Sequence, residues 1–217
     1  MNDITLTLLV MMAAGLLVVI VFALVHRSRT EQEQRLAEMA KERGWKVEVV
    51  REPLLYGFRI SKKNWRIDLL TQSDGNPKPK SSSNVTASTV WHAPGAGSTI
   101  LIGPRTSQIK LGGLGEGLLR QVLQMALGSE AEGLAEVQEG SESFRKNFMI
   151  WAREPEDVRR LISPFLESTL MKWKKYYPLL KRTQAGLTIE IRNAQLKKPE
   201  EIETLVKLGD LLLSQEF

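Results

Sequence analysis

A long apolar stretch near the N-terminus constrains this chain more than any other feature. Residues 4–25 read ITLTLLVMMAAGLLVVIVFALV and contain no charged side chain. As a helix, this stretch would measure roughly 33 Å, which is enough for the ~30 Å hydrocarbon core of a bilayer. The sequence therefore predicts a single transmembrane helix within residues 1–26, with the lipid bilayer as its partner through residues 4–25.

The residues that flank this stretch favour a permanent anchor over a cleaved signal peptide. A signal peptide begins with basic residues and has a shorter apolar run, whereas this chain begins Met-Asn-Asp. Arg27, Arg29 and Arg35 follow the stretch, and no Lys or Arg precedes it. By the positive-inside rule, we expect a single-pass protein of a bacterial inner (plasma) membrane, with its N-terminus outside and its soluble domain cytoplasmic.

The composition limits the chemistry that the rest of the chain can carry out. The absence of Cys excludes disulfides, Cys-ligated zinc and thiol catalysis. The chain has 30 Lys and Arg against 25 Asp and Glu. This modest positive excess suits an anionic surface at least as well as nucleic acid, for which a larger and clustered excess is expected. Nucleic acid is therefore an unlikely partner.

Residues 27–44 are expected to continue the first helix as a juxtamembrane stalk that stops at Gly44, a residue typical of helix C-termini. A soluble domain over residues 45–217 follows. Its first half alternates apolar and polar residues with the period of a β-strand. The expected strands form one antiparallel meander, with a hairpin loop at 61–64, and occupy residues 45–49, 56–60, 65–69, 85–91 and 99–102.

The second half of the domain mixes helices with strands. Apolar spacing predicts a helix over 115–127, and Gly128 to Gly140 is interpreted as a mobile acidic loop. Further strands are expected at 147–152 and 187–192, with helices that begin at Pro155, at Ser163-Pro164 and at Pro199. The predicted fold class is α+β: an N-terminal single transmembrane helix, then a mainly antiparallel sheet with about four packed helices.

A glycine-rich loop at 112–117, GGLGEG, precedes the helix expected at 115–127. The N–H groups at a helix N-terminus can bind phosphate. The spacing fits neither the dinucleotide fingerprint nor a phosphate loop, and Glu116 would repel an anion. A flexible turn is the simpler interpretation, and a nucleotide-binding or enzymatic domain is kept as an alternative.

A second candidate is the basic and aromatic segment 171–182, MKWKKYYPLLKR. Such a segment can lie on anionic lipid or stack on bases. It can equally be a helix end whose aromatic rings pack inward. The residues predicted to contact a membrane or a partner are Arg27, Arg29, Lys172, Trp173, Lys174, Lys175, Tyr176, Lys181 and Arg182.

No motif in the sequence predicts catalytic, cofactor-binding or metal-binding residues. His26 and His92 are the only histidines, and His92 is interpreted as a structural residue at the end of a strand. Asp68 is interpreted as part of the polar face of its strand. We therefore expect a non-enzymatic interaction or adaptor domain at the cytoplasmic face of the membrane, with a protein partner. Gly15, Ala13 and Ala14 could let two spans approach as a homodimer.

Overall fold

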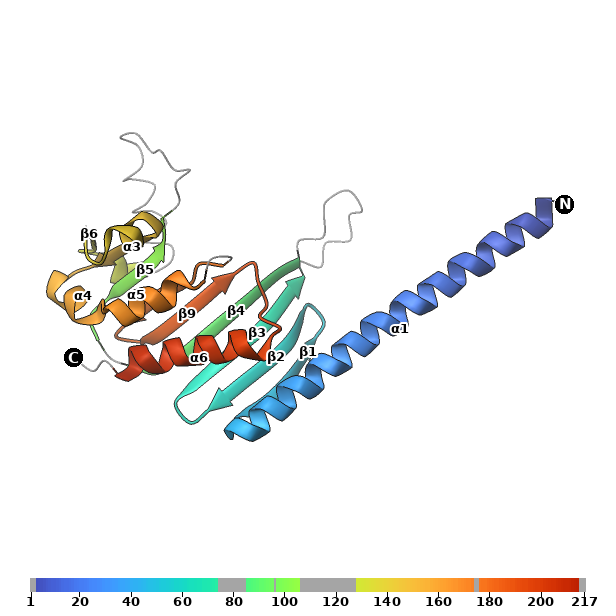
Figure 1. Cartoon of the computed structure of the whole chain (residues 1–217), viewed down its shortest axis with the longest axis horizontal. Helices are drawn as coiled ribbons and strands as arrows, with labels where there is room; N and C mark the ends of the chain where they lie inside the picture. Colours follow the sequence, from blue (N-terminus) through green and yellow to red (C-terminus); the bar gives the residue numbers. More distant parts are fainter. Residues whose placement is uncertain (1–2, 74–84, 96, 106–127, 174–175, 215–217) are drawn as a thin grey trace. The chain divides into compact units, whose positions relative to one another are not determined.

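The computed structural model describes residues 3–73, 85–95, 97–105, 128–173 and 176–214. The chain divides into two compact units, Met1–Trp45 and Lys46–Phe217. The first unit contains one helix, and the second contains a sheet with several helices (Figure 1).

Helix α1 (Asp3–Arg43) is continuous over 41 residues. It ends where the sequence predicts, because Gly44 adopts a left-handed backbone with a φ of 65°. The backbone N–H of Trp45 then donates to the carbonyl of Ala40 at 2.7 Å and satisfies one of the last helical carbonyls. Large apolar side chains between Met11 and Leu24 are 49% to 73% exposed.

The predicted transmembrane anchor is contradicted. Among the described residues, no helix has both the length and the apolar composition that a membrane crossing requires. The predicted fold class and the description as a single-pass transmembrane protein are corrected on this finding, and only the α+β content of the fold is retained.

In its described residues, the second unit is built on a nine-stranded sheet whose pairings there are all antiparallel. The strand order is β1-β2-β3-β4-β9-β8-β5-β7-β6. The strands are β1 (Lys46–Glu52), β2 (Leu55–Lys62), β3 (Trp65–Ser73), β4 (Val85–Ala93), β5 (Ile100–Pro104), β6 (Ala135–Val137), β7 (Phe148–Ala152), β8 (Leu179–Thr183) and β9 (Gly186–Arg192).

The predicted meander is correct for β1 to β4 and wrong for β5. The β2–β3 hairpin turns at Lys63 and Asn64, inside the predicted loop. The β8–β9 hairpin then lies between β4 and β5 in the sheet. Strand β8 is absent from the sequence-based assignment because its residues, LLKRT, carry two basic residues in a row and do not alternate clearly.

One row of apolar side chains crosses all nine strands on one face of the sheet. Residues that are directly opposite in register share a face, and this row links each strand to the next. Its members are Val47, Ile60, Ile67, Trp91, Ile189, Leu180, Ile102, Ile150 and Val137. Trp91, at the centre of the sheet, is fully buried. This face forms the main core.

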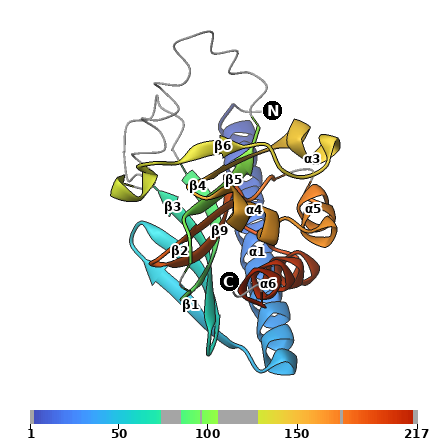
Figure 2. The ribbon, with the colours of Figure 1, turned by 90° about the vertical axis from the view of Figure 1, so that its left-hand side faces the viewer.

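Helices cover the core face. Within the described part of this unit they are α3 (Glu142–Asn147), α4 (Pro155–Leu161), α5 (Pro164–Met171) and α6 (Pro199–Ser214), while the short helix η1 (Gly128–Ala131) packs against Leu101 and Trp151 on the opposite face. Helices α5 and α6 run across the same face of the sheet (Figures 1 and 2). Helix α6 approaches so closely at Gly209 that a Cβ there would overlap the indole ring of Trp91. Among the described residues of this unit, no helix covers the opposite face along β2, β3, β4 and β9 (Figure 1).

The other predictions for the second half of the domain have mixed outcomes. Helices α4, α5 and α6 begin at the predicted prolines, and Ser163 caps α5 by accepting a hydrogen bond from the Leu166 N–H at 3.2 Å. The acidic loop predicted at 128–140 is wrong, because η1 and β6 lie within it. Helix α3 was not predicted. The helix predicted at 115–127 lies outside the described residues.

A candidate anion-binding cleft

A row of polar side chains crosses the open face of the sheet near one end of its strands. The register places Ser61 of β2 opposite Arg66 of β3, Arg66 opposite His92 of β4, and His92 opposite Thr188 of β9. Thr188 is in turn opposite Lys181 of β8. Neighbouring strands are about 4.8 Å apart. The row therefore presents donor groups from five adjacent strands.

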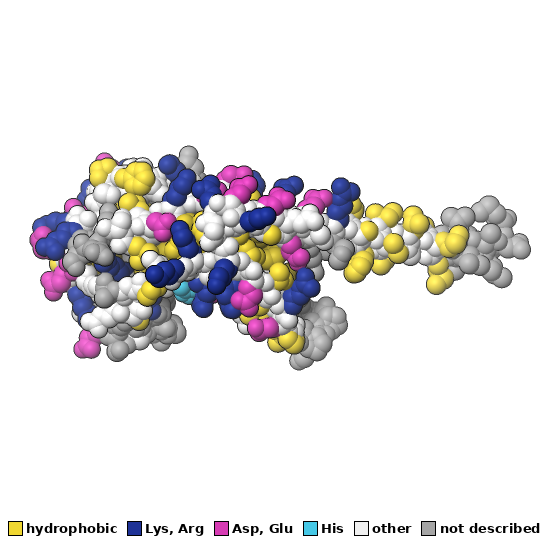
Figure 3. Space-filling view, turned by 90° about the horizontal axis from the view of Figure 1, so that it is seen from below, with side chains coloured by type: hydrophobic (Ala, Val, Ile, Leu, Met, Phe, Trp, Pro, Cys, Tyr) yellow, Lys and Arg dark blue, Asp and Glu magenta, His cyan; other side chains and the backbone are white. Residues whose placement is uncertain are grey.

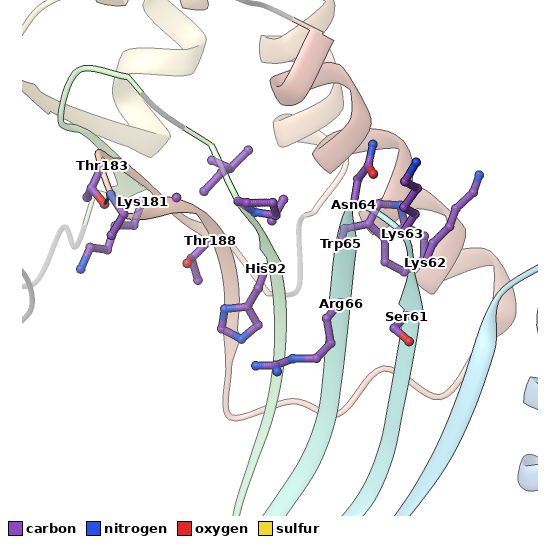
Figure 4. A pocket seen from close by; sticks show the side chains of 15 residues that line it. Ser61, Lys62, Lys63, Asn64, Trp65, Arg66, His92, Lys181, Thr183 and Thr188 are labelled. Carbon is purple, nitrogen blue, oxygen red and sulfur yellow. Dashed lines mark hydrogen bonds between the residues drawn. The ribbon is translucent and has the colours of Figure 1, made fainter.

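This row forms the floor of a cleft of about 520 Å³. The β2–β3 turn closes one side of the cleft, and the β8–β9 turn closes another. Figure 4 shows Arg66 and His92 side by side, with Lys62 and Lys63 at the turn beyond them. The lining residues are Ser61, Lys62, Lys63, Asn64, Trp65, Arg66, His92, Ala93, Pro94, Lys181, Thr183, Ala185, Gly186, Leu187 and Thr188.

The lining is strongly basic. It contributes four permanent cations, which are Lys62, Lys63, Arg66 and Lys181, together with His92. No Asp or Glu is among the described lining residues. Figure 3 shows Lys and Arg side chains gathered around the histidine on this side of the molecule. Several like charges on one concave surface produce a positive potential that attracts anions.

One buried carboxylate organises the basic side chains beside the cleft. Asp68 of β3 is 7% exposed and faces the same side as Arg66 and His92. Its Oδ1 accepts a hydrogen bond from Arg59 Nε at 2.9 Å. Its Oδ2 lies 3.1 Å from Arg66 Nε and 3.5 Å from His92 Nε2. Arg59 also reaches Glu48 of β1, at 3.5 Å between NH1 and Oε2.

These contacts keep Asp68 ionised. Burial alone would raise the pKa of Asp68, but hydrogen bonds from His92 and Arg59 and the charges of Arg66 and Arg59 lower it below its usual value. The hydrogen bond and the charge of Asp68 in turn raise the pKa of Arg59. Asp68 is therefore a fixed anion that holds two arginines and a histidine in place. Asp68 lies on the polar face of its strand, as the sequence predicts, but it is buried there by the basic side chains around it.

Two of the predicted contact residues, Arg27 and Arg29, belong to the first unit. Arg27 is exposed on α1 and pairs with Glu31, at 2.9 Å between Nε and Oε1. The side chain of Arg29 lies outside the described residues. Nothing in the structure tests their predicted role, which stays a prediction.

The basic and aromatic segment does not form one surface. Lys172 caps the C-terminal end of α5, and Trp173 is buried with 8% of its surface exposed. Tyr176 is partly buried, while Lys174 and Lys175 lie outside the described residues. Inward packing of the tryptophan agrees with the helix-end interpretation of the segment.

Two residues of the same segment, Lys181 and Arg182, are neighbours on β8 and therefore point to opposite faces of the sheet. Lys181 lines the cleft. Arg182 is half-buried beside Gly97, and burial lowers its pKa, an effect that the charge of Asp157 partly offsets. Of the predicted contact residues, Lys181 is thus the one that the structure brings into the cleft.

The other candidate sites add little. The glycine-rich loop at 112–117 lies outside the described residues. Within the described ranges, no group of three or more His, Asp or Glu side chains could hold a metal ion.

Sequence reasoning missed Lys62, Lys63, Arg66 and His92 as members of one site. The register of the hairpin could have joined Ser61 to Arg66, since its turn was predicted at 61–64. The placement of His92 beside Thr188 needs the pairing of β4 with β9, which the sequence pattern does not predict.

No protein-family model matches this sequence, and no curated protein or solved structure shows significant similarity to it.

Proposed function

We propose that residues 46–217 form a non-enzymatic binding domain that recruits an anionic partner through the basic cleft. The observation that carries this proposal is the lining itself, which combines four permanent cations with no described carboxylate. Ordinary surfaces intersperse both signs of charge. A concave surface of one sign gains most from a ligand of the opposite sign.

The electrostatics of the cleft support this proposal. Each cation is repelled by the others, and a bound anion replaces that repulsion with attraction. Asp68 offsets the charge of Arg66 from beside the cleft, and Asp210 of α6 interacts with the charge of Lys62. Charge-assisted hydrogen bonds of this type contribute roughly 1.5–3 kcal/mol each. Binding should therefore weaken as salt screens the cleft.

The state of Asp68 favours binding over catalysis. A general acid or base works best with a pKa near the operating pH, whereas the pKa of Asp68 is lowered and its oxygens already face three donors. The Asp68–His92 pair resembles half of a nucleophile relay. Among the described residues, however, no hydroxyl is hydrogen-bonded to His92. The cytoplasmic location and the protein partner that the sequence predicts stay predictions.

Calorimetry on the full chain tests this function, with tripolyphosphate and polyglutamate as anionic probes at low and high salt. The double variant Lys63→Met/Lys181→Met removes two cations from the cleft. The matched control, Lys197→Met/Lys198→Met, removes two exposed cations outside it. We expect binding of at least one probe, weakened roughly tenfold or more by the cleft variant and little changed in the control.

Two results would count against the proposal. If neither probe binds at low salt, the cleft is not an anion site. If both double variants weaken binding equally, the attraction comes from the net charge of the chain and not from the cleft.

A further inference from the structure

We infer that the ligand of this cleft is a small molecule with two or more phosphoryl groups. This inference rests on the proposed anion-binding function and names its ligand class. It is drawn from the size of the cleft, the chemistry of its donors and their arrangement along one row.

The size of the cleft favours a small ligand over a macromolecule. Its volume of about 520 Å³ falls within the range of roughly 300–1,000 Å³ that is typical of small-molecule sites. The turns at Lys63-Asn64 and at 184–185 bound it.

The donors suit phosphoryl groups better than isolated carboxylates. A phosphoryl group presents three acceptor oxygens and up to two negative charges. The floor offers the guanidinium of Arg66, the imidazole of His92, the hydroxyl of Thr188 and the ammonium of Lys181. A guanidinium and hydroxyls can donate to several oxygens of one group at once. Lys63 at the β2–β3 turn adds a further permanent cation to this donor set.

The length of the row favours more than one phosphoryl group. Arg66 and Lys181 are separated by three strand spacings, which is about 14 Å between backbones. A single phosphate bound between Arg66 of β3 and His92 of β4 would lie two strand spacings from Lys181 of β8. A chain of phosphoryl groups can contact both ends of the row.

Asp68 prepares one end of the row for the ligand. It binds Arg66 through Nε and so fixes the direction of the guanidinium before a ligand arrives. Figure 4 shows the resulting arrangement, in which the Arg66 and His92 side chains lie next to each other. Asp68 is a positioning residue here, because it acts through Arg66 and His92.

Competition among anions of different chemistry tests the ligand class. The affinities of the full chain for tripolyphosphate, orthophosphate and citrate are measured by calorimetry at one ionic strength, with polyglutamate and a single-stranded oligonucleotide for comparison. We expect tripolyphosphate to bind roughly tenfold or more tightly than citrate or either polymer, a difference of about one charge-assisted hydrogen bond.

The variant Lys181→Met should lower the affinity for tripolyphosphate by about tenfold while orthophosphate binds as before, since Arg66 and His92 remain. Lys197→Met is the matched control and should change neither affinity. Citrate, polyglutamate or the oligonucleotide binding as tightly as tripolyphosphate would overturn the inferred ligand class and leave the proposed function standing. Failure of every anion to bind would overturn both.

Discussion

Arg59 of β2 and Asp68 of β3 are directly opposite in the sheet, and Arg59 Nε donates a hydrogen bond of 2.9 Å to Asp68 Oδ1. Because Asp68 also contacts Arg66 and His92, one buried carboxylate joins three basic side chains from three neighbouring strands. The basic cleft and the stability of the sheet are thus linked through Asp68.

Replacing Asp68 with Asn should destabilise the domain at neutral pH by about 1–3 kcal/mol, because two arginines lose their charged partner. The effect should depend on pH. The pKa of Asp68 is lower in the folded state than its ordinary value near 3.9. The stabilisation by ionised Asp68 is therefore present above about pH 4. It is lost as the pH falls through the lowered pKa of Asp68 in the folded state.

Urea denaturation of the wild-type chain and of Asp68→Asn at pH 7 and at pH 2.5 measures this difference. Glu190→Gln is a suitable control, since Glu190 pairs with Arg192 on the exposed surface and should contribute little. An Asp68→Asn effect of the same size at both pH values would show that the charge of Asp68 is not its source.

Thr89 should be hard to replace with a residue of the same shape. Its hydroxyl is fully buried, donates to the carbonyl of Ala194 and accepts from the N–H of Leu196, both at 3.0 Å. Thr89→Val removes both hydrogen bonds and leaves two buried backbone groups unpaired, at a cost of about 1–3 kcal/mol. Thr89→Ser keeps the hydroxyl and should cost less. Thermal unfolding of the two variants checks this order, and equal losses would contradict it.

Gly209 should not tolerate a side chain. A Cβ at this position would lie 2.4 Å from the indole atoms Cε2 and Cζ2 of Trp91, so that α6 or the ring must move. Overpacking of this type costs about 1–3 kcal/mol. Gly15→Ala is the matched helical control, because a Cβ at Gly15 meets nothing within 4 Å. A Gly209→Ala melting temperature equal to that of the wild type would show that the helix can shift without loss.

The local part of the fold could be predicted from the sequence. Ser163 and Pro164 predict the start of α5, because a capping hydroxyl and a proline have defined positions in a first helical turn. The β2–β3 hairpin follows from two alternating runs joined by a polar turn. The sequence does not predict that β8 and β9 insert between β4 and β5, because alternation shows that a strand forms and not which strand it joins.

The candidate site was missed for the same reason. Arg66 and His92 are separated by a long stretch of chain and become neighbours only through the pairing of β3 with β4. Lys181 was among the predicted contact residues, but for a different reason: it belongs to a segment that mixes basic and aromatic residues. The prediction of the transmembrane anchor rested on hydropathy, and no helix of the described residues supports it.

Lysine footprinting of the full chain tests the central claim most directly. Acetylation of each lysine by a water-soluble reagent is followed by mass spectrometry, with and without saturating tripolyphosphate. A ligand in the cleft should slow the acetylation of Lys63 and Lys181, which line it, and leave the rates at Lys197 and Lys198 unchanged. Bound tripolyphosphate that protects Lys197 and Lys198 as much as Lys63 and Lys181, or that leaves Lys63 and Lys181 fully reactive, would contradict the assignment of the cleft as the anion site.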